Sequence, residues 1–187
     1  MKKKGALFII SAPSGTGKTT ICSRVRKKIP EIVFSVSHTT RQPRSGERQG
    51  IDYFFISPDE FKQKIEDGLW AEWARVHDHY YGTSAEFLDN ALLQKQIVLL
   101  DIDVQGARQI EAHYPDCATV FIMPPSMAAL RQRLEARQTD DAATIKKRMV
   151  NAEQEVAQKD RYRHIIINDD LSVAVNELVA LIRHYTG

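Results

Sequence analysis

Residues 6–20 read A-L-F-I-I-S-A-P-S-G-T-G-K-T-T. The run Ala6–Ser11 is short, apolar and rich in β-branched residues, which predicts a buried strand. A helical pattern begins at Lys18 and continues to about Lys28, before Pro30 ends it. A buried strand, a glycine-containing turn and a helix, in that order, predict the first unit of a parallel sheet with helices packed on it.

The turn between this strand and helix resembles a phosphate-binding loop. Gly17, Lys18 and Thr19 match the end of the pattern Gly, four residues, Gly-Lys-Ser/Thr, while Ala12 stands where the first glycine is expected. The tripeptide alone also fits a plain capped turn, but its place between a buried strand and a helix favours phosphate binding. Backbone N–H groups would then meet phosphate oxygens, with Lys18 on the β- and γ-phosphates and the Thr19 hydroxyl on Mg²⁺. The predicted nucleotide-phosphate site comprises Ala12, Pro13, Ser14, Gly15, Thr16, Gly17, Lys18, Thr19 and Thr20.

A second buried-type strand, Ile97–Ile102, contains Asp101 near its carboxyl end and is followed by Asp103. A carboxylate in that place can join the Mg²⁺ shell directly or through water, which makes Asp101 a candidate metal ligand. The alternative is that an aspartate here caps the helix starting near Val104, a role that Asp103 can serve. For Asp101 alone the sequence leaves both interpretations open.

The rest of the sequence predicts a different order of helices and strands in its two halves. Its first half predicts strands at Phe34–Ser37, Asp52–Ile56, Leu69–Val76 and His79–Thr83, a loop at Thr39–Gly50, and helices from Pro58 to about Asp67 and from Ser84 to about Lys95. Its second half predicts helices at Val104–His113, Met127–Arg137 and Ala142–Lys159, strands at Ala118–Met123 and His164–Asn168, and a last helix with an apolar stripe from Leu171 to Tyr185.

This order predicts an α/β fold of the P-loop NTPase type, a parallel sheet with helices on both faces. Consecutive strands in the middle predict a small, mostly antiparallel inserted lobe. We expect one domain over residues 1–187, with a core of 1–36, 84–125 and 160–187, an insertion at 37–83 and a helical lid at 126–159.

Composition restricts the class of protein. Among the 187 residues, 43% are hydrophobic and 27% charged, which is too apolar for a disordered chain. The net charge of +2 gives no basic field for nucleic acid or membrane, and no apolar stretch approaches the roughly 20 residues of a membrane span. Lys2–Lys4 before Ala6–Ile10 imitate a secretory signal, but that apolar run is too short. With two cysteines in no spacing pattern, we expect a cytoplasmic protein.

An acceptor site for a second anion is indicated between Ser37 and Tyr53. Arg41 and Arg44 stand in a loop rich in Pro and Gly, a spacing suited to bidentate phosphate binding. Tyr53 and Tyr81 can each donate a hydroxyl. Taken alone, Arg41 and Arg44 fit solvated surface arginines better.

A series of short motifs changes that interpretation. They are T-T-R-Q-P-R-S-G-E (39–47), D-Y-F-F (52–55), E-W-A (72–74), Y-Y-G-T (80–83), L-D-I-D-V-Q-G (100–106), R-L-E-A-R-Q-T (133–139) and N-D-D (168–170). In this order and spacing they resemble guanylate kinases over nearly the whole chain. The resemblance implies transfer of the γ-phosphate of ATP to GMP with Mg²⁺, giving ADP and GDP, in purine nucleotide metabolism.

The resemblance also implies residue roles. The GMP site would comprise Ser37, Arg41, Arg44, Glu47, Tyr53, Glu72, Tyr81, Thr83 and Asp103, of which Ser37, Glu72, Thr83 and Asp103 would meet the guanine. Asn168 and Asp169 would lie near the adenine, and Lys18, Arg44, Arg137 and Arg148 would act on the phosphates during transfer. Guanylate kinases usually have Gly after the arginine that corresponds to Arg137, whereas this chain has Gln138 there.

The chemistry of the bases supports this assignment independently. Guanine presents donors at N1 and N2, whereas an ionised carboxylate such as that of Glu72 only accepts. Adenine would leave that carboxylate unpaired, and sites of this kind reject the wrong base by a factor on the order of 10⁴ in favourable cases.

Two other functions stay open on the sequence. A sugar-phosphate kinase with the same core would not need Glu72 and Asp103 set for guanine. A non-catalytic scaffold of guanylate kinase type tends to lose the loop lysine, whereas Lys18, Thr19 and Asp101 are all present. Oligomeric state is not indicated.

Overall fold

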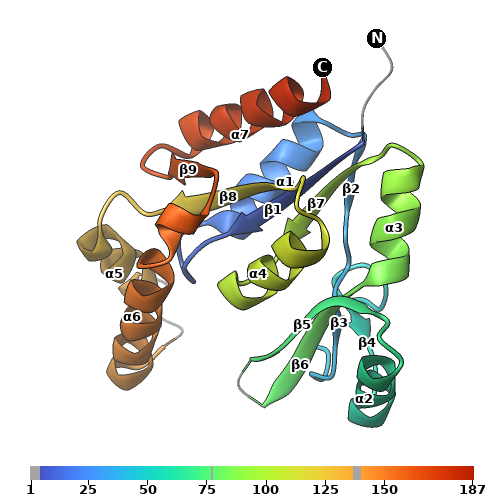
Figure 1. Ribbon diagram of the computed structural model, residues 1–187. Coiled ribbons are helices and arrows are strands. Elements are labelled where there is room, and N and C mark those ends of the chain that lie inside the picture. Colours follow the sequence, from blue (N-terminus) through green and yellow to red (C-terminus); the bar gives the residue numbers. More distant parts are fainter. Residues whose placement is uncertain (1–4, 77, 137–139) are drawn as a thin grey trace.

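Two β-sheets organise the chain in the computed structural model, which describes residues 5–76, 78–136 and 140–187 (Figure 1). The main sheet has five parallel strands in the order β2-β7-β1-β8-β9, and the second has four in the order β4-β3-β6-β5. The strands are β1 (Ala6–Ser11), β2 (Ile32–Phe34), β3 (His38–Thr39), β4 (Phe54–Phe55), β5 (Trp70–Val76), β6 (His79–Ser84), β7 (Ile97–Asp101), β8 (Ala118–Met123) and β9 (His164–Ile167).

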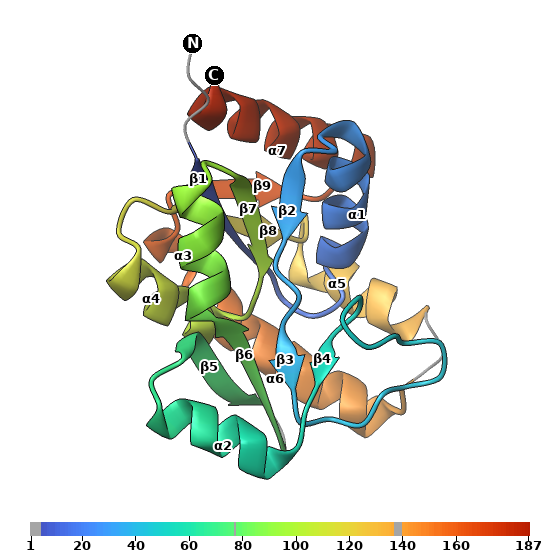
Figure 2. The same ribbon diagram turned by 90° about the vertical axis from the view of Figure 1, so that its right-hand side faces the viewer.

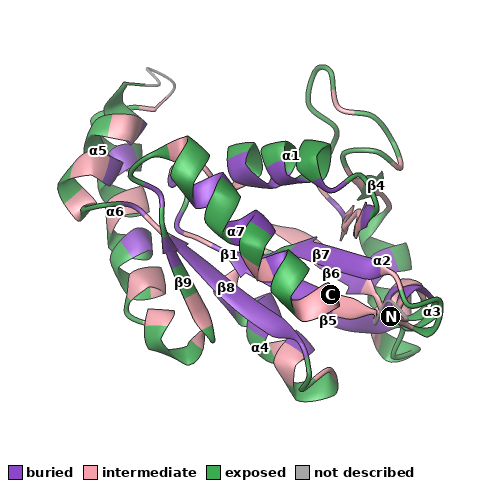
Figure 3. Cartoon of the chain, turned by 90° about the horizontal axis from the view of Figure 1, so that it is seen from above, coloured by how far each residue is buried: buried purple, intermediate pink, exposed green. Residues whose placement is uncertain are grey.

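Helices cover both faces of the main sheet. The helical elements are α1 (Lys18–Lys28), α2 (Pro58–Glu66), α3 (Ala85–Leu93), α4 (Val104–His113), α5 (Met127–Glu135), α6 (Ala142–Val156), a short 3₁₀ turn η1 (Lys159–Arg161) and α7 (Leu171–Thr186). Of these, α1 and α7 cover one face of the main sheet, and α3 and α4 cover the other. Alternate residues of β1 divide the core, because Phe8 and Ile10 pack with α1 and α7 while Leu7 and Ile9 pack with α3 and α4. Figure 3 shows the resulting buried strands between helices that are exposed on their outer sides. The predicted fold class is confirmed.

The second sheet and α2 extend away from the main sheet (Figure 2). Phe61 of α2 is fully buried and stacks on Trp70 and Tyr80 at centroid distances of 4.5 and 5.3 Å. Ser57 caps α2 by accepting a hydrogen bond from the Glu60 N–H at 3.1 Å, as its sequence predicts. Pairing in this sheet is antiparallel for β3–β6 and β5–β6 and parallel for β3–β4.

Several predicted boundaries are wrong, and pairing explains two of them. The strand predicted at Phe34–Ser37 is found at Ile32–Phe34, because Ile32 aligns with Ile97 and the ladder with β7 ends after Phe34. The strand predicted at Asp52–Ile56 shrinks to Phe54–Phe55, since Asp52 instead accepts from the Arg48 N–H at 2.7 Å in a turn.

Two helices are shorter than predicted. α5 ends at Glu135, and α6 ends at Val156, before Lys159 in the 3₁₀ turn. α5 and α6 form a small cluster of their own around Leu130, Leu134 and Ala152. Within the described residues, no helix combines the length and apolarity needed to cross a membrane.

Candidate active site

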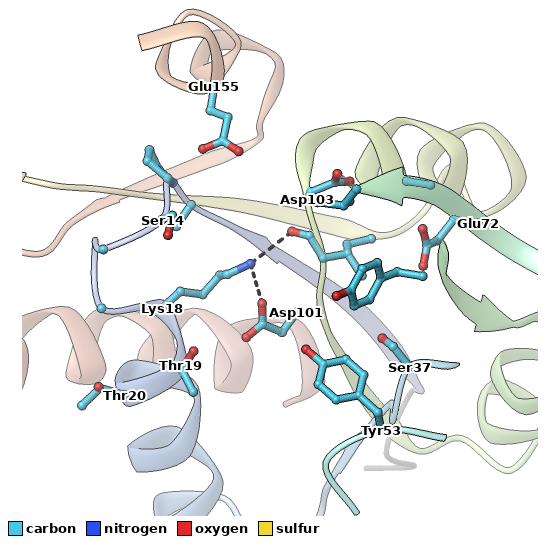
Figure 4. A pocket seen from close by; sticks show the side chains of 18 residues that line it. Ser14, Lys18, Thr19, Thr20, Ser37, Tyr53, Glu72, Asp101, Asp103 and Glu155 are labelled. Carbon is cyan, nitrogen blue, oxygen red and sulfur yellow. Dashed lines mark hydrogen bonds and ion pairs between the residues drawn. The ribbon is translucent and has the colours of Figure 1, made fainter. Parts of the chain in front are cut away.

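A cavity of about 490 Å³ opens where β1 and β7 end, between the main sheet and the second sheet (Figure 4). Because the strands of the main sheet are parallel, their carboxyl ends meet at this edge. Its lining includes Ala12, Pro13, Ser14, Gly15, Gly17, Lys18, Thr19, Thr20, Ser37, Tyr53, Glu72, Tyr81, Asp101, Asp103 and Glu155. Residues predicted for two separate anions therefore line one cavity.

The loop after β1 has the backbone geometry of an anion site. Gly15 and Gly17 have φ values of 95° and 98°, which glycine adopts without strain. Lys95 is the only non-glycine residue with positive φ in the described part of the chain, so Ala12 is not forced into a glycine conformation. α1 starts at Lys18 without a side-chain cap among the described residues, which leaves its first N–H groups available to a ligand.

Lys18 reaches across the cavity to the end of β7. Its ammonium forms an ion pair with Asp101 and donates a hydrogen bond to the Ile102 carbonyl at 3.3 Å. Asp103 caps α4 through Oδ1, which accepts from the N–H groups of Gln105 and Gly106 at 3.1 and 2.8 Å. The capping role thus belongs to Asp103, and Asp101 is free to face the cavity beside Thr19.

Glu72 is a buried acid in the wall of the cavity. It is 4% exposed, and its Oε1 accepts a hydrogen bond from the fully buried Thr83 hydroxyl at 2.6 Å. Burial raises the pKa of Glu72 to about 7, with a further rise from Asp103 that the Thr83 bond opposes. A Cβ on Gly106 would lie 2.5 Å from Glu72 Oε2, so only glycine leaves room for this carboxyl.

Arg41 is held in a prepared position. Its Nη2 pairs with Glu47 Oε1 at 2.8 Å, and its guanidinium lies 5.4 Å from the centroid of the Tyr53 ring. The other Glu47 oxygen accepts from the Arg44 N–H at 2.8 Å, and Arg41 lowers the pKa of Glu47. Glu47 therefore organises the arginine loop. The Arg44 side chain is exposed on that loop rather than in the cavity wall.

A second cavity of about 860 Å³ adjoins the first and shares Ser14, Val76, Asp103 and Glu155 with it. One face of α6 lines it, with Thr144, Lys147, Arg148, Asn151 and Glu155. Arg148 pairs with Asp140 at 3.2 Å and lies in this wall. The predicted Arg137 and Gln138 lie outside the described residues.

One residue at the site, Glu155, was missed by the sequence interpretation. Glu155 points from α6 toward Ser14 (Figure 4), and burial, with Asp103 adding, raises its pKa to about 7. Its signal was the polar stripe Thr144, Arg148, Asn151 and Glu155 at helical spacing. Asn168, expected near the adenine, is 5% exposed, and its side chain donates a hydrogen bond to the Thr16 carbonyl of the phosphate loop. Arg133, which the family motif implies as a weaker candidate for contacting the phosphates, donates to the Asn168 carbonyl. Asp169 is exposed.

Known proteins resemble this chain in sequence and in fold. A family model described as guanylate kinase matches residues 4–185. The chain is 46% identical over 182 residues to the guanylate kinase of Geobacter metallireducens, covering 97% of this chain and 90% of that protein. It is 47% identical over 180 residues to that of Haemophilus ducreyi, covering 95% and 87%. The crystal structure of guanylate kinase from Anaplasma phagocytophilum superposes with a TM-score of 0.82 at 28% identity, covering 100% and 88%.

Proposed function

This chain belongs to the guanylate kinase family, and from that premise we propose which of its residues bind the two nucleotides and support the transfer. The chain is an ATP:GMP phosphotransferase, a nucleoside monophosphate kinase that converts ATP and GMP to ADP and GDP. One observation carries the assignment of residues: the loop around Lys18 and the buried acid Glu72 line the same cavity.

The acceptor nucleotide binds on the side of the second sheet. Glu72 and Asp103 accept hydrogen bonds from guanine N1 and N2, with Ser37 and Thr83 completing the base site. Burial raises the pKa of Glu72 to about 7 in the free protein. Hydrogen-bond donors from guanine would stabilise the charged form of this carboxyl group. Arg41, Tyr53 and Tyr81 bind the GMP phosphate, and Arg44 joins them from the loop that Glu47 organises.

The donor nucleotide places its phosphates on residues 12–20. The N–H groups of the loop and of the start of α1 bind the oxygens, and Lys18 exchanges Asp101 for the β- and γ-phosphates. Thr19 and Asp101 offer a hydroxyl and a carboxylate oxygen, donors that suit Mg²⁺, which keeps several waters and binds phosphate besides one or two protein groups. When bound, Mg²⁺ would supply positive charge that offsets the negative charge of the phosphates.

The reaction needs no protein base. The second pKa of a phosphate monoester is about 6, so the GMP phosphate is already largely an anion at neutral pH. The residues must instead offset the repulsion between two anions and align them for transfer. Lys18, Arg44 and Arg148 supply this charge, with Arg137 as the further arginine that the family motif implies.

Closure brings these groups together. We assign residues 37–83 as the GMP lobe, 126–159 as the lid and the remainder as the core. Movement of both parts toward the cavity would exclude the water that hydrolyses ATP. Both cysteines are buried and free, which fits a reducing cytoplasm, and the small net charge argues against nucleic acid or a membrane as partner.

An assay of ADP formation from ATP against GMP, AMP, CMP and UMP tests the function. We expect use of GMP far above the others, and loss of turnover by orders of magnitude in Lys18→Ala with an unchanged circular dichroism spectrum. Phosphorylation of a ribose phosphate with none of GMP would instead identify a sugar-phosphate kinase. Near-normal turnover in Lys18→Ala would contradict the role of that lysine.

A further inference from the structure

A partly buried hydrogen-bond network lies behind the phosphate loop. Asn168, which follows β9, donates through Nδ2 to the Thr16 carbonyl at 2.6 Å. Arg133 of α5 donates to the Asn168 carbonyl at 2.9 Å and to the Thr16 carbonyl at 3.4 Å. Two side chains from distant elements therefore converge on one carbonyl group of the loop.

The position of this network relative to the cavity is informative. Gly15 and Gly17 line the cavity, whereas Thr16, Asn168 and Arg133 do not belong to its described lining. Thr16 is fully buried, and a Cβ on Gly17 would lie 2.7 Å from Asn168 Nδ2. Asn168 is thus packed directly against the back of the loop.

Peptide geometry connects the network to the ligand. In a trans peptide unit the carbonyl and the following N–H point in opposite directions. Holding the Thr16 carbonyl toward Asn168 and Arg133 therefore turns the Gly17 N–H the other way, toward the cavity. Because Gly17 has a φ of 98° and no Cβ, the unit would otherwise rotate with little steric hindrance.

We propose that Asn168 and Arg133 are positioning residues that fix the Thr16–Gly17 peptide so that its N–H donates to the donor phosphates. This role rests on the proposed function of the cavity, and it differs from a contact with adenine, which the family motif implies for Asn168. A residue that acts through the loop affects every triphosphate equally, whereas a residue that contacts adenine affects only adenine nucleotides.

Calorimetry with three probes separates these roles. Asn168→Asp replaces the amide donor by a carboxylate oxygen, which repels the Thr16 carbonyl. Arg133→Gln replaces the second donor by a shorter side chain that does not reach this carbonyl. For both variants we expect ATP and inorganic tripolyphosphate, each with Mg²⁺, to bind about 10-fold or more weakly, and GMP to bind as before. Asn176→Asp on α7 and Arg131→Gln on α5, both exposed, are the matched controls.

The possible outcomes decide the proposal. Weaker ATP binding with unchanged tripolyphosphate binding would overturn it in favour of adenine contact, and equal weakening of GMP would overturn it in favour of a general structural role. Arg133→Lys, which keeps one donor and the charge, should recover part of the tripolyphosphate affinity. If Asn168→Asp fails to fold, Asn168→Ser serves with the same probes. A wild-type protein that phosphorylates no GMP would defeat the proposed function, and that result is independent of these ratios.

Discussion

Glu72 is buried, and ionising its carboxyl group there lowers the stability of the folded protein. Its pKa rises from 4.5 in the unfolded reference to about 7 in the folded protein. The native state therefore binds more protons between these pH values, and the free energy of unfolding falls as pH rises from about 4.5 to about 7. The guanine-binding role proposed for Glu72 therefore opposes the stability of the free protein.

Glu72→Gln removes that titration. We expect the melting temperature of the variant relative to the wild type to increase between pH 5 and pH 8, by about 2–4 °C for each kcal/mol of relieved desolvation. The same variant should lose about 10- to 100-fold in kcat/KM for GMP and far less for ATP. Glu66→Gln on α2 controls for the loss of one charge. A difference in melting temperature that does not change with pH would contradict the role of Glu72. Equal losses of kcat/KM for GMP and ATP would contradict it as well.

At the scale of elements, α4 and β5 are joined by one side chain. Gln109 of α4 donates through Nε2 to the Trp73 carbonyl at 2.8 Å and accepts from the Trp73 N–H at 3.1 Å. Trp73 is next to Glu72, and α4 begins after Asp103, so this pair fixes the spacing of the two acids. Gln109 therefore joins the two elements to which we assign the guanine site.

Gln109→Ala should cost about 1–3 kcal/mol of stability for the two lost hydrogen bonds, measured by urea unfolding. We also expect a higher KM for GMP at nearly unchanged KM for ATP. Gln63→Ala, which removes an exposed glutamine bonded to Asp67, is the matched control. An unchanged GMP KM would show that the acids keep their spacing without this bridge.

Local signals explain which elements could be predicted. β1, α1, α4 and β8 were predicted with the observed bounds, because each has a continuous apolar pattern between strong end signals. β2 was misplaced because its ends depend on alignment with Ile97 and Leu99, which are far away in sequence. In the site, Lys18 lies in a recognisable motif. Glu155 belongs to a polar stripe at helical spacing, but the element that this stripe faces depends on which parts of the chain meet. The loop that Asn168 contacts depends on this too, and no local pattern encodes it.

For the whole molecule, the position of the cavity between two sheets and α6 predicts contraction on binding. In X-ray scattering we expect the radius of gyration to fall most when GMP and a non-hydrolysable ATP analogue are both present. Each ligand at 100 times its Kd should also add about 2.7 kcal/mol to the free energy of unfolding. Arg148→Ala should reduce the contraction, since Arg148 lines the adjoining cavity along α6. An unchanged radius with both ligands bound would argue against closure.

The hydrogen bond between Thr16 and Asn168 joins residues 152 positions apart in the chain. During translation, the nucleotide loop leaves the ribosome early, while its partner emerges only with the final strand. During most of the synthesis, the loop of the nascent chain therefore lacks the hydrogen bond from Asn168 that fixes it. We expect nucleotide binding to begin abruptly, when Asn168 has left the exit tunnel.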